Sequence, residues 1–207
     1  MDRYLTINKE SRVKIAVGAC RFIASVGFCS SEEQARNFIH SVQGEFSDAA
    51  HNAYAYKIGS GDEAVIRTSD AAEPVGTAGP PLLSAIEKAG VTNVVLVGTR
   101  YFGGVKLGIG GLIRAYRACG QAGLEKAGIR EKIGKKEYTL SIPYDFIGQV
   151  MKEISGFQGE VTEVRYGSRV EIDAVLLPGQ LDVFQRKLND VTRGQGMIKI
   201  NNRNECK

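Results

Sequence analysis

A glycine-rich stretch without acidic residues has the residue types that bind phosphate. It runs from Lys88 to Leu124 and contains nine of the 25 glycines and five basic side chains. Accessible backbone amides, Lys and Arg bind phosphate groups, and flat rings such as Tyr101 and Phe102 stack on bases. We therefore expect a phosphate or nucleic-acid site formed by these residues: Arg100, Tyr101, Gly103, Gly104, Lys106, Gly110, Gly111 and Arg114.

The glycine pattern matches neither of two common phosphate-binding motifs. A dinucleotide fingerprint needs a third glycine where this chain has Ile113, and no Gly-Lys-Ser/Thr triplet forms a P-loop. A structural alternative stays open, in which the glycines permit a tight crossover and the basic side chains are only solvated.

A second stretch, Ser69–Gly79, carries carboxylates and hydroxyls. Asp70 and Glu73 can bind a cation, pair with an arginine, or act as general acid and base, which makes Glu73 the candidate catalytic residue. The structural alternative is that Asp70 satisfies turn amides and Glu73 forms a salt bridge. His51 and Asn52, at the start of a predicted strand, can hydrogen-bond across to this loop. The alternative, which is the more common outcome for a lone histidine, is that His51 is a core residue whose hydrogen bonds are satisfied within the fold.

Cysteine and histidine give no metal site. The four cysteines are scattered without a C-x-x-C pair, and the only histidines are His40 and His51. No zinc spacing can be written from them, so we expect no metal, no cofactor and mostly buried, reduced thiols.

Patterning along the first part of the chain predicts the elements that position these residues. Ser30 and Glu33 form a capping box that starts a helix, and Pro80 and Pro81 open a second helix. The other expected elements are strands within 12–26, at 53–58 and at 64–68, a turn at 59–62, a central strand at 94–97, a glycine loop at 98–111 and a helix at 112–126 that ends at Gly128.

The last part of the chain has a different order of predicted strands and helices. Residues 128–136 are polar and predict a linker, which gives domains at 1–134 and 135–207. The order that follows is a strand at 138–143, a helix at 146–154, strands at 161–166 and 170–176, a helix at 181–191 and a strand at 197–200, typical of a ferredoxin-like fold. Tyr138 and Tyr166 are candidates for RNA contacts on its sheet, and we expect at least one of them to pack in the core instead.

Composition limits the partners. The 207 residues are 43% hydrophobic and 24% charged, with no apolar run long enough to span a membrane. The first residues lack the layout of a signal peptide, so we expect a cytoplasmic protein with no membrane partner. The net charge is +4, whereas the acid-free stretch alone carries +5, so the positive charge is local.

Several blocks together resemble the bacterial, YigZ-like branch of the IMPACT family over residues 12–125. They are Ala50–Tyr56 (AHNAYAY), Glu73–Leu82 (EPVGTAGPPL), Thr99–Gly108 (TRYFGGVKLG) and Gly110–Tyr116 (GGLIRAY). The resemblance implies an α+β fold of two domains: an N-terminal ribosomal-protein domain-2-like domain and a ferredoxin-like C-terminal domain similar to that of elongation factor G. It also implies a role in translation, with these supporting site residues: His51, Asn52, Asp70, Glu73, Thr77 and Tyr116.

One departure from the family pattern affects the acidic loop. The family usually has Asp-Asp-Gly-Glu-Pro where this chain has Asp70-Ala71-Ala72-Glu73-Pro74. A carboxylate is lost at Ala71 and the conformational freedom of glycine is lost at Ala72.

Three functions follow as hypotheses. The first is a regulatory binding protein that contacts RNA or the ribosome through the basic glycine surface. The second is an enzyme that acts on a nucleotide or phosphorylated small molecule, with Glu73 as acid–base and Arg100 on the phosphate. The third is a regulator that binds a protein partner through an apolar patch away from the glycine stretch. We expect a binding protein rather than an enzyme.

Overall fold

The computed structural model describes residues 3–59, 61 and 64–200. The chain folds as two compact α+β units: one comprises Tyr4–Lys132, and the other comprises the residues from Ile133 onward together with Arg3. Ser60 and Asp62 of the predicted turn, and Cys206, lie outside the described residues.

The first unit is built on a five-stranded antiparallel sheet. Its strand order is β2 (Ser11–Val17), β3 (Cys20–Phe28), β6 (Val94–Tyr101), β4 (His51–Ile58) and β5 (Val65–Ser69). The apolar run of β6 lies at the centre and is buried on both faces, as its continuous hydrophobicity predicts.

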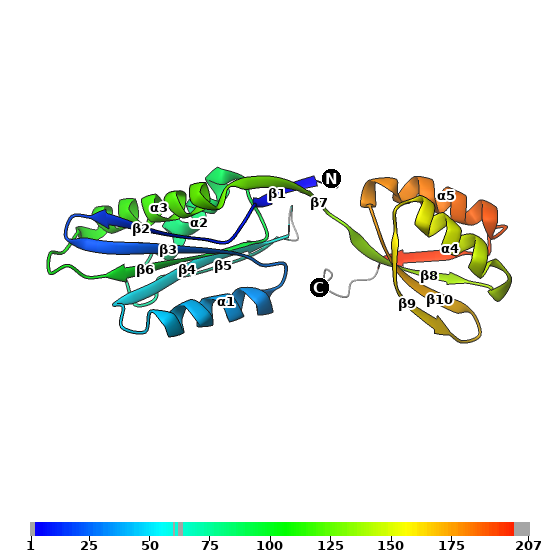
Figure 1. Ribbon diagram of the computed structural model, residues 1–207, viewed down its shortest axis with the longest axis horizontal. Helices are drawn as coiled ribbons and strands as arrows, with labels where there is room; N and C mark the ends of the chain where they lie inside the picture. Colours follow the sequence, from blue (N-terminus) through cyan, green and yellow to red (C-terminus); the bar gives the residue numbers. More distant parts are fainter. Residues whose placement is uncertain (1–2, 60, 62–63, 201–207) are drawn as a thin grey trace. The chain divides into compact units, whose positions relative to one another are not determined.

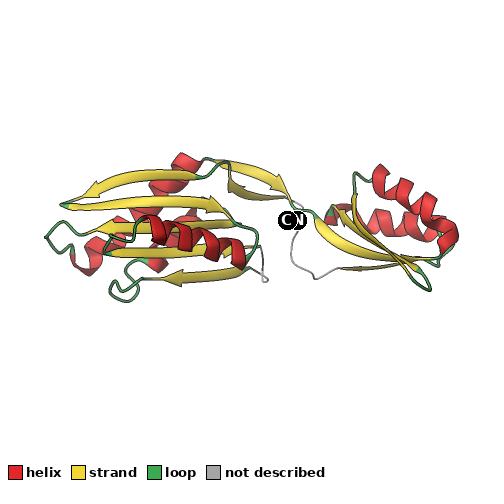
Figure 2. Cartoon of the chain, turned by 60° about the horizontal axis from the view of Figure 1, so that its bottom comes forward, coloured by secondary structure: helices red, strands yellow, loops and turns green. Residues whose placement is uncertain are grey.

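Helices cover both faces of this sheet. Helices α2 (Gly79–Ala89) and α3 (Gly108–Ala127) lie on one face, and α1 (Glu32–Glu45) lies on the other (Figures 1 and 2). Because side chains alternate along a strand, Leu96 of β6 packs into the α2–α3 core while Val95 and Val97 pack beneath α1. The same alternation decides which residues of the strand end reach the candidate site.

The helix ends follow the predicted signals with one shift. The N-cap of α1 is Ser31 rather than Ser30: its hydroxyl accepts from the Gln34 amide at 3.2 Å, and the Gln34 side chain accepts from the Ser30 amide at 2.8 Å. The prolines open α2 as predicted, and α3 ends at Gly128.

Two predicted irregular segments are wrong in part. Residues 98–111 are not one loop, because β6 continues through Tyr101, paired with β3 and β4, and α3 begins at Gly108. Only 102–107 remains as a connection, which we call the glycine loop below. The predicted linker contains β7 (Ile129–Ile133), which pairs with β1 (Arg3–Ile7). Long-range strand pairing decides both segments, and local composition does not report it.

The second unit has the predicted ferredoxin-like order. Its elements are β8 (Lys136–Ile142), α4 (Ile147–Gly156), β9 (Glu160–Tyr166), β10 (Val170–Leu176), α5 (Leu181–Val191) and β11 (Met197–Ile200), with a sheet order of β11-β8-β10-β9. Both helices cover one face of the sheet (Figures 1 and 2). Tyr138 is buried in the core between them, so it is not an RNA contact. Within the described part of the chain, no helix is long and apolar enough to cross a membrane.

Candidate functional site at the start of helix α3

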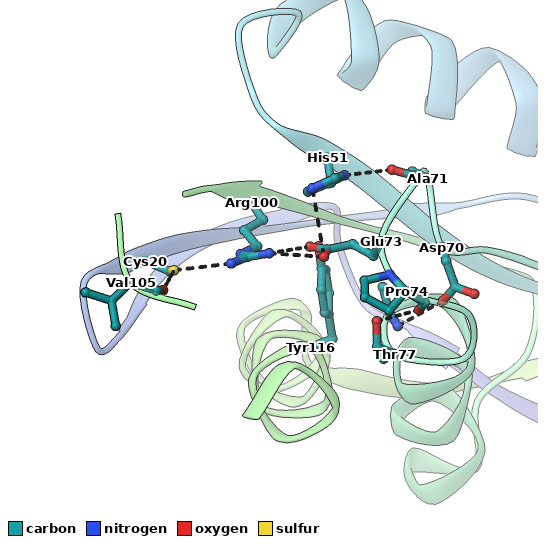
Figure 3. Close-up of polar contacts among 11 residues, drawn as sticks. Cys20, His51, Asp70, Ala71, Glu73, Pro74, Thr77, Arg100, Val105 and Tyr116 are labelled. Atoms are coloured by element: carbon teal, nitrogen blue, oxygen red, sulfur yellow. Dashed lines mark hydrogen bonds and ion pairs between the residues drawn. The ribbon is translucent and has the colours of Figure 1, made fainter. Parts of the chain in front are cut away.

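Glu73 and Arg100 form a buried ion pair at the centre of the region that the sequence singled out. Nη1 of Arg100 donates to both carboxylate oxygens of Glu73, at 2.9 and 3.0 Å, and the two side chains are only 7% and 2% exposed (Figure 3). The hydroxyl of Tyr116 donates to the same carboxylate at 2.7 Å. Glu73 thereby joins the acidic loop to β6 and α3.

His51 lies at the edge of this cluster. Its Nε2 is 3.8 Å from Glu73 Oε2, and its Nδ1 is 2.8 Å from the Ala71 carbonyl (Figure 3). Since a carbonyl only accepts hydrogen bonds, Nδ1 is the protonated nitrogen in this contact. The predicted bridge from His51 to the acidic loop is therefore present.

The environment keeps Arg100 charged and Tyr116 protonated. Burial alone lowers the pKa of Arg100, but hydrogen bonds with Cys20 and Glu73 outweigh it and raise that pKa above its ordinary value. Burial, and then the bond to Glu73, raise the pKa of Tyr116. Both groups therefore stay donors to Glu73 at neutral pH.

Arg100 is not the mobile surface cation that the sequence suggested. Its Nη2 donates to Cys20 Sγ at 3.5 Å, and that thiol contacts the Val105 carbonyl at 3.9 Å (Figure 3). Its Nε is buried and has no acceptor among the described residues. The guanidinium is thus held beneath the glycine loop.

Asp70 organises the acidic loop and the start of α2. Its carboxylate accepts from the amides of Gly76, Ala78 and Gly79 at 2.8–2.9 Å, and the N-cap of α2, Ala78, offers no side-chain bond of its own. Burial raises the pKa of Asp70, but the three amide bonds lower it more, so it lies below the ordinary value. Asp70 acts as a remote cap, which is the turn-satisfying alternative named above.

Backbone strain lies in the acidic loop at Ala71 and Ala72, the two positions at which the sequence departs from the pattern that it resembles. Ala71 and Ala72 have φ angles of 48° and 66°, the left-handed region that favours glycine. The loop keeps the conformation suited to glycine although Ala72 replaces it. Thr77 closes the loop by donating to the Pro74 carbonyl at 2.7 Å (Figure 3).

The predicted glycines have different structural roles. A Cβ at Gly103 would lie 1.9 Å from the Ala19 carbonyl, so this position packs against the β2–β3 hairpin. Gly104 has a φ of +88° that turns the loop. Gly110 and Gly111 lie in the first turn of α3, where the N-cap residue Leu107 makes no side-chain bond and no acidic residue is present.

Exposed cations and apolar side chains surround that first turn. Lys106 and Arg114 are exposed, as is Arg117. Phe102, Val105 and Ile109 are 50%, 64% and 65% exposed. Because the first amides of a helix lack partners within the helix and carry partial positive charge, this end of α3 attracts anions. We call Lys106, Arg114 and Gly108–Gly111 the α3 start.

Two predicted site residues lie on the opposite face of the sheet. Tyr101 follows Arg100 in β6 and therefore points toward α1, where its hydroxyl donates to Asp48 at 2.7 Å and its ring contacts Arg21. Asn52 accepts from Thr99 at 2.7 Å on the same face. The sequence reasoning missed this separation because it treated Gly98–Gly111 as loop.

Phe102 and Cys20 belong to the neighbourhood of the site although the predicted residue set omitted them. The Arg100 guanidinium carbon is 5.4 Å from the centre of the Phe102 ring and 5.9 Å from that of Phe22. Extending β6 to Tyr101 from its β-branched and aromatic residues would have placed Arg100 and Phe102 on the α3 side. Nothing in the sequence points to Cys20.

The exposed face of the second unit's sheet carries carboxylates. Asp173 is buried and accepts from Thr139 at 2.6 Å, while Arg165 bonds to Asp173, Glu163 and Glu171 at 2.6–3.3 Å. These residues alternate with the core positions of β8, β9 and β10. Tyr166, the last residue of β9, pairs with the core residue Val170 and is 69% exposed, so an RNA contact at Tyr166 stays a prediction.

The described residues 3–59, 61 and 64–200 contain no group of three His, Cys, Asp or Glu side chains that holds a metal ion. Cys20, Cys29 and Cys119 are buried and free, as the sequence predicted for its thiols.

Comparisons with known proteins cover nearly the whole chain. Residues 19–124 match the Impact N-terminal domain, and residues 140–195 match a domain of unknown function, DUF1949. IMPACT family member YvyE of Bacillus subtilis (strain 168) is 33% identical over 96% of this chain and 91% of that protein. IMPACT family member YigZ of Escherichia coli (strain K12) is 32% identical over 84% of this chain and 86% of that protein. A crystal structure of a hypothetical protein, 29% identical, covers 98% of this chain and 99% of that one with a TM-score of 0.80.

Proposed function

The chain belongs to the IMPACT family, and on that premise we propose that it is a translation-linked binding protein that contacts RNA, free or in the ribosome, through the α3 start. The observation that carries the proposal is an exposed helix start without a side-chain cap, flanked by Lys106 and Arg114 and free of carboxylates. Phosphates bind at helix starts because the amides and the helix dipole favour negative charge.

Charge separation between the surfaces supports the first unit as the RNA-binding one. The stretch from Lys88 to Leu124 has no acidic residue, whereas the sheet face of the second unit that the helices leave open carries the exposed Glu163 and Glu171 beside Arg165. A phosphate backbone is attracted more strongly to the former, because the carboxylates of the latter offset the charge of Arg165.

The enzyme hypothesis receives less support from the same residues. Glu73 already accepts from Arg100 and Tyr116, and Arg100 is turned inward toward Glu73 and Cys20. Buried carboxylates that are fully hydrogen-bonded to protein donors are typical of a structural ion pair. We therefore keep Glu73 as a residue that shapes the site and assign it no acid–base step.

The test is equilibrium binding of a fluorescent single-stranded RNA oligonucleotide at low salt. Lys106→Gln with Arg114→Gln is expected to weaken binding about tenfold, because two phosphate contacts are lost. The matched control, Lys88→Gln with Lys126→Gln, removes two exposed cations from the last turns of α2 and α3 and is expected to leave affinity unchanged. Equal affinity of wild type and the Lys106/Arg114 variant, or no binding at low salt, would contradict the proposal.

A further inference from the structure

Phe102 is an exposed aromatic ring with a fixed support. It is the first residue after β6 and is half exposed, and the charged guanidinium of Arg100 lies 5.4 Å from its ring centre. A cation beneath a ring is attracted by the ring's electron-rich face. The half-exposed ring therefore keeps surface available to solvent while Arg100 supports it from inside the protein.

The support is rigid because Arg100 itself is fixed. Both oxygens of Glu73 hold Nη1, and Cys20 accepts from Nη2. A ring that is already held in place loses little conformational entropy when a ligand stacks on it. Burying an exposed aromatic side chain against a ligand lowers the free energy of the system. Stacking of a flat ligand on Phe102 is therefore more favourable than contact of the ring with water.

The charges nearby decide what kind of flat partner fits. Phe102 precedes Lys106 by four residues and Gly108, the first residue of α3, by six, within the stretch that has no carboxylates. A base attached to a phosphate satisfies both features, whereas an apolar protein segment satisfies only the ring. In a duplex the bases are stacked on one another, so a single ring of the protein needs an unpaired base.

We propose that Phe102 is a stacking platform for one unpaired base of a single-stranded RNA segment whose phosphate lies at the α3 start. The proposal rests on the proposed function and adds the strand type and the contact residue. Tyr101, although adjacent, takes no part because its hydroxyl and ring are occupied by Asp48 and Arg21 on the other face.

The absence of tryptophan from the chain gives a direct test. Phe102→Trp places the chain's single tryptophan, which can be excited selectively over the tyrosines, at the proposed platform, and Tyr101→Trp places one on the opposite face as a matched control. Single-stranded RNA is expected to quench Phe102→Trp emission by stacking and to leave Tyr101→Trp emission unchanged. A fully paired RNA duplex of the same length is expected to quench neither.

Affinity measurements complete the test. Stacking is worth about 1–3 kcal/mol per base, so Phe102→Ala is expected to weaken single-strand binding about 5- to 150-fold while the salt dependence stays the same. Phe102→Leu is expected to bind as poorly as Phe102→Ala, since it keeps apolar surface but no ring. Wild-type affinity of Phe102→Leu for single-stranded RNA would overturn the proposal.

The failure of this inference is separable from failure of the proposed function. If RNA binding depends on Lys106 and Arg114 but Phe102→Trp is not quenched and Phe102→Ala binds normally, only the platform is wrong. If wild type does not bind RNA at low salt, the proposed function itself is wrong.

Discussion

The carboxylate of Glu73 is the single group on which most of the site's geometry depends. It accepts from a strand residue, Arg100, and from a helix residue, Tyr116, while belonging to a loop. Burying both charges has a large desolvation cost, which their mutual contact offsets only while both partners remain. The pair therefore fixes how three segments meet rather than adding much net stability.

Removing one member of the pair should be far more harmful than removing an exposed carboxylate. Glu73→Gln leaves the Arg100 charge buried without its partner, and we expect a loss of about 3–5 kcal/mol in unfolding free energy. Tyr116→Phe, which removes one neutral donor, should cost about 1 kcal/mol. Urea denaturation followed by circular dichroism measures both, with exposed Glu87→Gln as the control. A Glu73→Gln variant within 1 kcal/mol of wild type would contradict this role.

The residue types in the sequence predicted an ion pair as one possibility, but they did not predict which side chains form it. Pairing of Glu73 with an arginine was one of several alternatives, because Arg100 and Arg114 were equivalent in the sequence. The choice depends on β6 turning Arg100 inward while α3 leaves Arg114 exposed. Whether the α3 start binds phosphate stays a prediction.

At the scale of elements, the acidic loop caps the N-terminus of α2 through Asp70, a residue that lies outside the helix. Asp70 binds three amides that include the first residues of the helix, and its pKa lies below the ordinary value despite burial. Its anionic form is therefore the one that the folded state favours.

The lowered pKa of Asp70 predicts a pH dependence with a definite sign. A carboxylate with a depressed folded-state pKa stabilises the fold above its unfolded value, about 3.9, and loses that contribution as pH falls toward the folded value. Asp70→Asn should lower unfolding free energy by about 1–2 kcal/mol at pH 7. The difference from wild type should shrink below about pH 4. A gap between the two proteins that stays constant from pH 7 to pH 3 in urea titrations would refute this origin.

Replacing Ala72 with glycine should stabilise the fold, because Ala72 lies in the left-handed region. Ala72 has a φ of 66°, a conformation that costs an L-residue about 1–2 kcal/mol. Glycine avoids this cost, but it also increases the conformational entropy of the unfolded chain, which offsets part of the gain in stability. Ala72→Gly should therefore raise unfolding free energy by up to about 1 kcal/mol. Ala118→Gly, at an exposed position inside α3, should lower it by about 1 kcal/mol. The same sign for both substitutions in thermal denaturation would contradict the strain argument.

Elements with strong local patterns were predictable, and those formed by distant pairing were not. The apolar run of β6, the prolines of α2 and the rhythm of the second unit all appear as expected. Strand β7 was assigned to a linker because its residues are polar and its partner, β1, is more than a hundred residues away. The end of β6 was assigned to a loop because Gly98 weakens strand propensity, although two neighbouring strands pair with it.

At the scale of the whole molecule, positive charge is concentrated in one stretch of the sequence, although Arg100 within it is buried and paired with Glu73. The net charge of +4 is smaller than the +5 of the stretch from Lys88 to Leu124, and the residues outside that stretch sum to −1. Such a local concentration of positive charge attracts an anionic polymer to this part of the first unit. It also makes the strength of binding depend on salt, since each phosphate contact releases counterions.

The slope of RNA affinity against salt concentration is the measurement that tests this account most directly. For single strands, each phosphate contact contributes about 0.7 to the slope of log K against log salt. Lys106→Gln with Arg114→Gln should therefore reduce the magnitude of the slope by about 1.4 relative to wild type, and the Lys88/Lys126 control should not change it. A wild-type slope in the Lys106/Arg114 variant would contradict the claim that the α3 start holds the phosphates.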